Sequence, residues 1–399
     1  MLMRSVLITF VLAPLMFLSQ ISGTKAEDFR TIIGGFEKVN ELYPASSAPM
    51  TGPERLYWVD LSQFVRDLGQ QNLPILKGGY YFMPEVGSMP VKSVKLSDDN
   101  GILINLDANI ARKYTEDDLE QFWHFLTDEA IRLMELRNKT KPSAVIVVYD
   151  GYSYSYHRPK KQGDLLQRRK ASRAPAVSGP VVVSEGHGLY RKLDAAGVFV
   201  GWVYQRALVN NIREDELTPD YADELESWLV SRSGSDVRRT RNPSSTNYGP
   251  ANAPWRNVAA RYNLKNILPN NPEIWDSPPN PNSANEPVKK YENQDIRSRP
   301  FYANFLNAAV LIGLHSNAAA SSSAKGGRIY YDTRLSENGE LARHIGCYMK
   351  DFIHAKPQFQ TFDVSLRETV DKYGELRFSN VPSVIVEIAF HTNVEDAGY

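Results

Sequence analysis

Three apolar segments of this chain end in the same way, with a reactive side chain at or just past the carboxyl end. They read Val181-Val-Val-Ser-Glu-Gly-His187-Gly, Val310-Leu-Ile-Gly-Leu-His315-Ser-Asn and Val384-Ile-Val-Glu387-Ile-Ala-Phe-His-Thr-Asn. Short continuous apolar runs are typical of buried strands. Because the carboxyl ends of strands in an open α/β sheet share one edge, where ligands bind, we expect His187, His315 and Glu387 to converge.

The segments around these runs alternate strands and helices, which predicts an α/β layer structure. A helix is expected to begin at Thr218-Pro219 and to run to about Arg232, with its apolar residues on one face. Residues 242–300 are rich in Pro, Asn and Ser. This stretch is too long for an ordinary connection, so it is either an inserted lobe or a substrate-binding excursion.

The first part of the chain has a different pattern. Strands are expected at 102–106 and 144–149, with a long helix starting after Thr115 between them. Residues 27 to about 60 lack periodicity and suggest a loose lead-in. Together with the 399-residue length, these features predict a small α+β domain ahead of the α/β domain.

A basic stretch separates the two predicted domains. It resembles a solvated hinge more than a surface for an anionic polymer, although both functions stay open. The predicted division is 1–26 for a signal peptide, 27–157 for the N-terminal domain, 158–176 for the linker and 177–399 for the α/β domain, which includes the insertion at about 242–300.

The first 26 residues follow the order of a secretory signal peptide. Arg4 gives a positive start, Ser5 to Leu18 is almost uninterrupted apolar sequence, and Ala26 ends a small-residue cleavage pattern. We therefore expect export to the periplasm or cell envelope. No other segment is long and apolar enough to cross a bilayer, so no stable membrane anchor is expected after cleavage.

Charge and cysteine content narrow the function classes. The chain has 46 basic and 46 acidic residues, so no net field favours nucleic acid. Cys347 is the only cysteine, so internal disulfides are excluded. It lies in a helical pattern at 340–352, where a buried thiol is expected.

Two histidines and a carboxylate at one sheet edge are a familiar ligand set for catalytic zinc, with a fourth position left for water. Zinc lowers the pKa of that water to about 7, and a nearby carboxylate can accept its proton. A single buried histidine is more often a core residue. Two at strand ends, in a chain with seven histidines, shift the balance towards a metal.

The three blocks resemble, in the same order, the signature blocks of the zinc-dependent N-acetylmuramoyl-L-alanine amidases, a family whose first block usually reads Asp-Pro-Gly-His-Gly. The resemblance covers residues from about 180 to 399. It implies a twisted, mostly parallel sheet flanked by helices. It also implies a peptidoglycan substrate, cleaved at the amide between the lactyl group of muramic acid and L-alanine.

The resemblance assigns His187 and His315 as zinc ligands and Glu387 as the catalytic carboxylate. The remaining ligand in the family is a glutamate at the start of the helix after the first block. Glu214 is our choice from the register of the helix that follows, with Asp215 and Glu216 as rivals.

One departure from the family pattern affects the support of the first ligand. Ser184-Glu185 replaces the usual Asp-Pro. The residue that contacts the imidazole of His187 from behind is therefore open, and Glu185 is one candidate for that contact.

Further roles follow from position alone. Asn317, His391 and Arg297 are candidates for substrate contact, and Arg299, like Arg297, is a candidate partner for a peptide carboxylate. Two other functions stay open: a zinc peptidase or deacylase acting on a related amide, and a non-catalytic wall-binding protein. A regulatory protein partner through the N-terminal domain is a further expectation.

Overall fold

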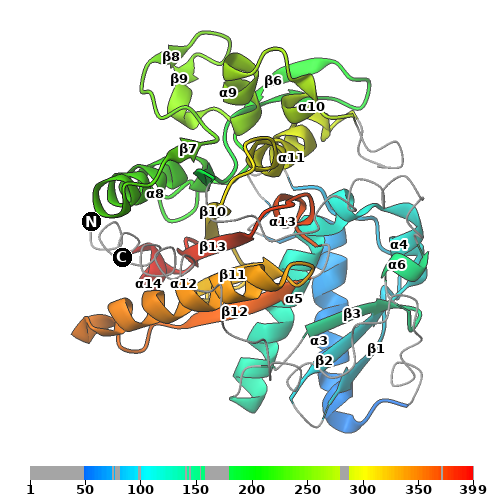
Figure 1. The fold of residues 1–399 in the computed structure, drawn as a ribbon. Helices are drawn as coiled ribbons and strands as arrows, with labels where there is room; N and C mark the ends of the chain where they lie inside the picture. Colours follow the sequence, from blue (N-terminus) through cyan, green and yellow to red (C-terminus); the bar gives the residue numbers. More distant parts are fainter. Residues whose placement is uncertain are drawn as a thin grey trace. The chain divides into compact units, whose positions relative to one another are not determined.

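The computed structural model describes residues 49–73, 76, 81–97, 100–139, 142, 145–152, 154–157, 179–278, 287–369 and 372–398. Contacts divide the chain into two compact units (Figure 1). The catalytic unit comprises Ala171–Tyr399 and also takes in Ile75–Tyr81, while the other unit comprises Ile21–Pro74 and Phe82–Lys170. The predicted signal peptide and basic linker lie outside the described residues. None of the described helices is apolar over a length that could span a bilayer.

The N-terminal unit holds a three-stranded sheet. Its strands are ordered β1-β2-β3, with β1 antiparallel and β3 parallel to β2. The elements are α3 (Gly52–Gly69), β1 (Val91–Leu96), β2 (Ile102–Leu106), α4 (Ala108–Lys113), α5 (Glu116–Asn138), β3 (Val145–Tyr149) and α6 (Tyr154–His157). Both predicted strands and the long helix capped by Thr115 are confirmed. The loose lead-in is wrong from Gly52 on, because Thr51 and Glu54 form a capping box that starts α3.

The catalytic unit is built on a six-stranded sheet in the order β12-β11-β13-β10-β4-β7. The strands are β4 (Val181–Glu185), β7 (Val237–Arg239), β10 (Val310–Asn317), β11 (Gly327–Asp332), β12 (Val364–Thr369) and β13 (Ser383–Phe390). Only the β11–β13 pair is antiparallel among these neighbours. The predicted mostly parallel sheet is confirmed, and the three signature strands β4, β10 and β13 are adjacent at its centre.

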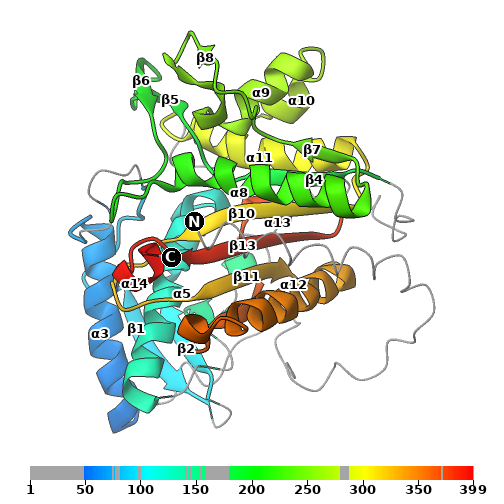
Figure 2. The same cartoon turned by 90° about the vertical axis from the view of Figure 1, so that its left-hand side faces the viewer.

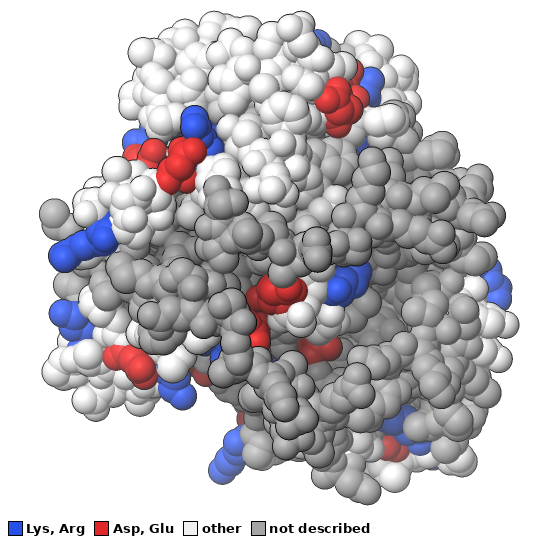
Figure 3. All heavy atoms as spheres, viewed as in Figure 1, with Lys and Arg blue, Asp and Glu red and all other residues white. Residues whose placement is uncertain are grey.

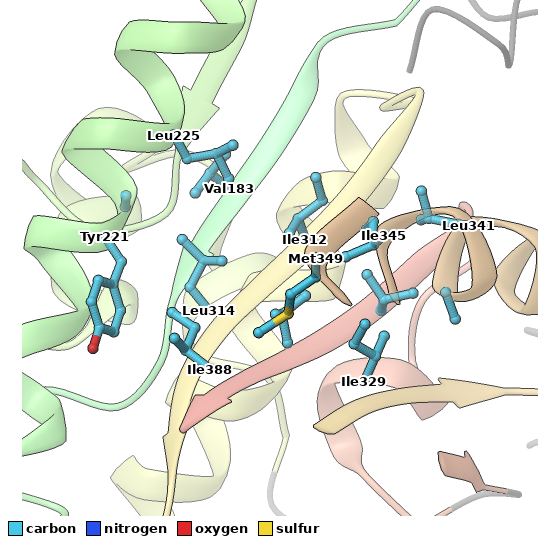
Figure 4. Close-up of a cluster of buried hydrophobic side chains, with 14 of the residues drawn as sticks. Val183, Tyr221, Leu225, Ile312, Leu314, Ile329, Leu341, Ile345, Met349 and Ile388 are labelled. Carbon is cyan, nitrogen blue, oxygen red and sulfur yellow. The ribbon is translucent and has the colours of Figure 1, made fainter. Parts of the chain in front are cut away.

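Helices cover both faces of this sheet (Figure 2). One face packs against α8 (Glu214–Trp228) and α12 (Ser336–His354), where Leu225 and Met349 belong to the same apolar core as Val183 and Ile312 (Figure 4). The opposite face packs against α9 (Ala260–Ile267), α10 (Pro272–Trp275) and α11 (Lys290–Phe305). Cys347 is exposed on α12, so the predicted buried thiol is wrong.

The remaining elements are short. They are β5 (Tyr190–Leu193), β6 (Phe199–Val203), η3 (Leu229–Ser233), β8 (Asn247–Tyr248), β9 (Ala253–Pro254), η4 (Trp255–Asn257), η5 (Pro357–Phe359), α13 (Gly374–Arg377) and α14 (Val394–Ala397). Strands β5 and β6 pair as an antiparallel hairpin. We call this hairpin together with residues 242–278 the lobe, which stands at the top of Figure 1.

Helix α8 begins at Glu214, four residues before the predicted start. Pro219 therefore lies inside the helix, where it lacks the N–H that would bond to the carbonyl of Asp215. The guanidinium of Arg241 replaces that donor, because its Nη2 lies 2.8 Å from the Asp215 carbonyl oxygen. The helix can thus pass through Pro219 without a buried carbonyl left unsatisfied.

We predict that Arg241→Met lowers the free energy of unfolding by about 2–5 kcal/mol, since it leaves buried carbonyls of Asp215 and Gly186 without their donor. Urea unfolding measures this change. The matched control is Arg238→Met, because Arg238 is exposed and, among the described residues, forms an ion pair only with Asp236; it should cost less than about 1 kcal/mol. Equal losses in the two variants would contradict the role given to Arg241.

Candidate metal centre

His187, Glu214 and His315 lie together at the carboxyl edge of the catalytic sheet. His187 follows β4, Glu214 is the first residue of α8, and His315 lies near the end of β10. Glu214 Oε1 is 2.9 Å from His315 Nδ1 and 3.4 Å from His187 Nε2. One ligand atom from each residue falls within a group no wider than 4.8 Å, and all three residues are buried. This arrangement could hold a metal ion.

The turn after β4 brings the two imidazoles close, with their ring centroids 4.9 Å apart. Gly186 passes directly over the ring of His315, where a Cβ would come within 2.5 Å of Nδ1. His187 itself has a φ of 37°, in the left-handed region that non-glycine residues avoid. Such strain at a buried residue marks a functional constraint on the position of its side chain.

Three acidic residues compete for the metal-facing position at the start of α8, and the structure separates them. Glu214 meets the two histidines. Asp215 instead accepts backbone N–H groups of Gly188, Gln205 and Arg206, at 2.9, 2.8 and 3.0 Å. Glu216 is exposed and contacts Tyr204 and Arg213. Successive helical residues point about 100° apart, so only one of the three can face the histidines.

The ring nitrogen of His187 that points away from Glu214 is also held. His187 Nδ1 lies 2.8 Å from Gln205 Oε1, and Gln205 Nε2 donates to Asp295 Oδ2 at 3.2 Å. Gln205 is fully buried just after β6, and Asp295 is fully buried on α11. The orientation of this imidazole is therefore set from outside the metal group.

The second imidazole has an equivalent support. His315 Nε2 lies 3.2 Å from Glu375 Oε2 on α13, and Arg299 Nη1 donates to the same oxygen at 3.1 Å. Arg299 Nη2 also donates to Asp295 Oδ2 at 2.5 Å. Gly313 leaves room for the carboxylate, because a Cβ there would lie 2.7 Å from Glu375 Oε1. We call Gln205, Asp295, Arg299 and Glu375 the support chain.

Glu387 lies on β13 directly opposite His315 on β10. Residues in register on neighbouring parallel strands project to the same face, so this buried carboxylate shares the face of the metal group. His391, just past the strand, is also buried, and its Nδ1 lies 2.9 Å from Ser316 Oγ. Asn317 is buried too and accepts the backbone N–H of Ala318 through Oδ1.

Comparison with known proteins identifies the family. The family model described as N-acetylmuramoyl-L-alanine amidase matches residues 181–399, more than half of the chain. The chain belongs to the N-acetylmuramoyl-L-alanine amidase family. A search of curated proteins finds no significant match.

Several solved amidase structures are similar to this chain at low sequence identity. The catalytic domain of CwlV from Bacillus (Paenibacillus) polymyxa var. colistinus is 18% identical, with 55% of this chain and 85% of that chain covered at a TM-score of 0.31. An N-acetylmuramoyl-L-alanine amidase of Nostoc punctiforme is 16% identical, with 55% and 83% covered at 0.30. One of Mycobacterium smegmatis is 13% identical, with 56% and 87% covered at 0.32.

The surroundings of the two histidines shift their pKa values in opposite directions. Burial and nearby cations lower the pKa of His187 well below its ordinary value. Burial also disfavours the charged form of His315, but hydrogen bonds to Glu214 and Glu375 outweigh it and raise the pKa to about 10. The pKa of Glu375 falls to about 2 despite burial, chiefly because of Arg299 and His315. Without a metal ion, the surroundings thus favour the neutral form of His187 and the charged form of His315.

Two expectations about the surroundings of the site are wrong. Glu185 does not support His187, since its buried carboxylate is occupied by Arg239, Thr240 and the backbone N–H of Arg241. Arg299 is not available to bind a peptide carboxylate, because its side chain is 1% exposed and hydrogen-bonded to Asp295 and Glu375.

Arg297, the other candidate on α11, is likewise buried, at 6% exposed. Its expected contact with substrate, like those of Asn317 and His391, stays a prediction.

The support chain is the part of the site that sequence patterns did not reveal. Gln205 lies in a loop and Glu375 in the short helix α13, neither of which a periodic pattern predicts, and Asp295 lies in the stretch interpreted as an inserted lobe or a substrate-binding excursion. One signal was available, because Asp295 and Arg299 have the four-residue spacing of a helical ion pair.

We predict that His315 of the metal-free protein titrates near pH 10 in histidine NMR spectra, while His187 stays neutral. Because the folded-state pKa of His315 exceeds its unfolded value of about 6.5, the stabilisation is complete below that pH and is lost as pH rises through about 10. The free energy of unfolding of metal-free protein should fall over this window. Glu375→Gln should lower the pKa of His315; an unchanged titration would contradict the pairing.

Proposed function

We propose that this chain is a zinc-dependent N-acetylmuramoyl-L-alanine amidase that hydrolyses the amide between muramic acid and L-alanine in peptidoglycan. Family membership supports the amidase function and the peptidoglycan substrate. The observation that carries the zinc chemistry is the buried group of His187, Glu214 and His315 at the sheet edge.

The residues present fit a catalytic zinc ion. Two imidazole nitrogens and one carboxylate oxygen are a three-ligand set that leaves a fourth position for water or substrate. The outward ring nitrogens of His187 and His315 are already bonded to Gln205 and Glu375, as is usual for metal-binding histidines. When bound, zinc supplies a Lewis acid for the lactyl carbonyl and lowers the pKa of bound water to about 7.

Glu387 is the proposed catalytic carboxylate. It shares a sheet face with His315, and it is 7% exposed, so its carboxylate works largely shielded from bulk water. In this role Glu387 accepts a proton from the attacking water and delivers it to the nitrogen of the leaving L-alanine. We also propose that His391, Asn317 and Arg297 contact the substrate.

The decisive experiment is product analysis on purified peptidoglycan. We expect about one zinc per chain and release of stem peptides with free L-alanine amino termini, abolished by a chelator. His187→Ala should lose both zinc and activity, whereas Glu387→Gln should keep zinc and lose activity by a factor of about 10²–10⁴. Other new termini would indicate a peptidase or deacylase. Peptidoglycan binding without metal or products would indicate a non-catalytic wall-binding protein.

We also propose export of the chain and the division into domains at 26, 157 and 176. The support is the signal-like order of the first 26 residues and the location of peptidoglycan outside the cytoplasmic membrane. Mass spectrometry of the exported protein should give Glu27 as its first residue, and brief proteolysis should cut within 158–176. Intact Met1 in the exported protein, or cleavage elsewhere, would contradict this. A regulatory partner of the N-terminal unit stays a prediction.

A further inference from the structure

A cavity of about 780 Å³ opens in the lobe and shares no lining residue with the metal group. Its size falls within the range of about 300–1,000 Å³ that is usual for sites of small organic ligands. The lining contains seven aromatic side chains, four cations and a single carboxylate, which is that of Asp276. Such a lining suits a ligand that has apolar faces and also carries negative charge.

The aromatic part of the lining is a cluster of rings set at different angles. Tyr248 and Trp255 have centroids 4.3 Å apart with their planes tilted by 49°, and Trp202 and Tyr262 are 4.9 Å apart with a tilt of 54°. Trp202, Tyr248 and Trp255 are only half-buried, so part of each ring faces solvent. The negative face of an aromatic ring attracts the C–H bonds of a pyranose, which favours a saccharide.

Two cations of the lining, Arg191 and Lys265, lie over aromatic rings. Arg191 lies over the ring of Phe199 at 4.5 Å, and Lys265 lies over that of Trp275 at 5.1 Å. In the part of the chain that the structure describes, neither cation forms an ion pair with a carboxylate. These side chains leave donors available for an anionic ligand.

Arg261 adds a buried donor. It is 5% exposed, its Nη2 donates to Gln294 Oε1 at 3.0 Å, and Asp276 lies 3.5 Å away. Its Nε has no hydrogen-bond partner among the described residues. A buried donor without a partner costs free energy, which a bound anion would recover.

The cavity is built on the same framework as the metal group. Hairpin β5–β6 begins just after His187 and ends just before Gln205, and it supplies Arg191 and Trp202 to the cavity. The backbone N–H of Arg261 donates to Asp295 Oδ1 at 3.0 Å, while the other oxygen of Asp295 accepts from Gln205. A ligand in the cavity therefore lies on the elements that hold a proposed zinc ligand.

We propose that the cavity is a subsite for an anionic saccharide, namely muramic acid whose lactyl carboxylate has been freed. This assignment rests on the proposed function. Amide hydrolysis consumes one water and leaves a carboxylate on the lactyl group and an amine on L-alanine. Each turnover thus converts a neutral sugar substituent into an anion that matches the cations of the lining.

Nucleic acid offers stacking and charge as well, but the rest of the molecule does not favour it. The chain has no net charge. On the face drawn in Figure 3, basic and acidic side chains are interspersed, without a continuous basic patch over the described atoms.

The test is a titration of the full chain followed by tryptophan fluorescence. Peptide-free oligosaccharides of alternating N-acetylglucosamine and N-acetylmuramic acid should bind with a Kd at least about tenfold below that of neutral N-acetylglucosamine oligomers of equal length. Added salt should reduce the difference. The peptide-free glycan lacks the amide between the lactyl group and L-alanine, so the binding measurement does not depend on whether amidase activity is found.

Matched variants localise the binding. Arg191→Gln and Trp255→Ala should each raise the Kd for peptide-free glycan by at least about tenfold. Arg238→Gln and Phe305→Ala are the controls, because Arg238 pairs with Asp236 at the surface and Phe305 is 50% exposed outside the cavity. Zinc content and melting temperature should match wild type in all four variants.

Several results would overturn the assignment. Equal binding of acidic and neutral saccharides would remove the role of the cations. Tighter binding of poly(glycerol phosphate) would give the site to a different anionic polymer, and tighter binding of a single-stranded oligonucleotide would give it to nucleic acid. Losses in the control variants equal to those in the cavity variants would also count against it.

Discussion

A buried arginine between two carboxylates holds the functional edge of the catalytic unit in place. Arg299 is 1% exposed and bonds both Asp295 and Glu375. Breaking such a group by removing one partner leaves a buried charge uncompensated, at a cost of about 3–5 kcal/mol. The three side chains therefore fix α11 and α13 against each other, and through Glu375 they fix the ring of His315 at the end of β10.

The central strands and three of the four proposed catalytic-site residues could be predicted from sequence because their signals are local. An apolar run followed by a polar group identifies a strand end without knowledge of the rest of the chain. Glu214 is harder to assign from sequence, since Asp215 and Glu216 follow it directly. Only the position at which α8 starts decides which of the three acidic residues faces the two histidines. The sequence predicts that start at Thr218-Pro219, because proline is favoured at the first position of a helix. The guanidinium that makes an interior proline tolerable comes from Arg241, far along the chain.

The support chain shows what sequence patterns leave out. Gln205, Asp295 and Glu375 are distant in sequence and meet only after the sheet, α11 and α13 have assembled. Similarly, periodicity on α12 identifies an apolar face but does not decide on which side of its boundary Cys347 falls. Sequence patterns thus predict where helices lie and where strands end, but they do not predict which distant residues a polar side chain will bond to.

Asp295 and Arg299 lie within the 242–300 stretch, whose helices α9, α10 and α11 cover one face of the catalytic sheet, and most elements of the lobe lie there too. The stretch that contains most of the lobe is therefore not a separable addition to the catalytic unit. A chain shortened through this stretch would lose the carboxylate on which Gln205 rests, and with it the fixed orientation of His187. Attempts to reduce this protein to its smallest catalytic body must keep α11, whatever is cut from the loops ahead of it.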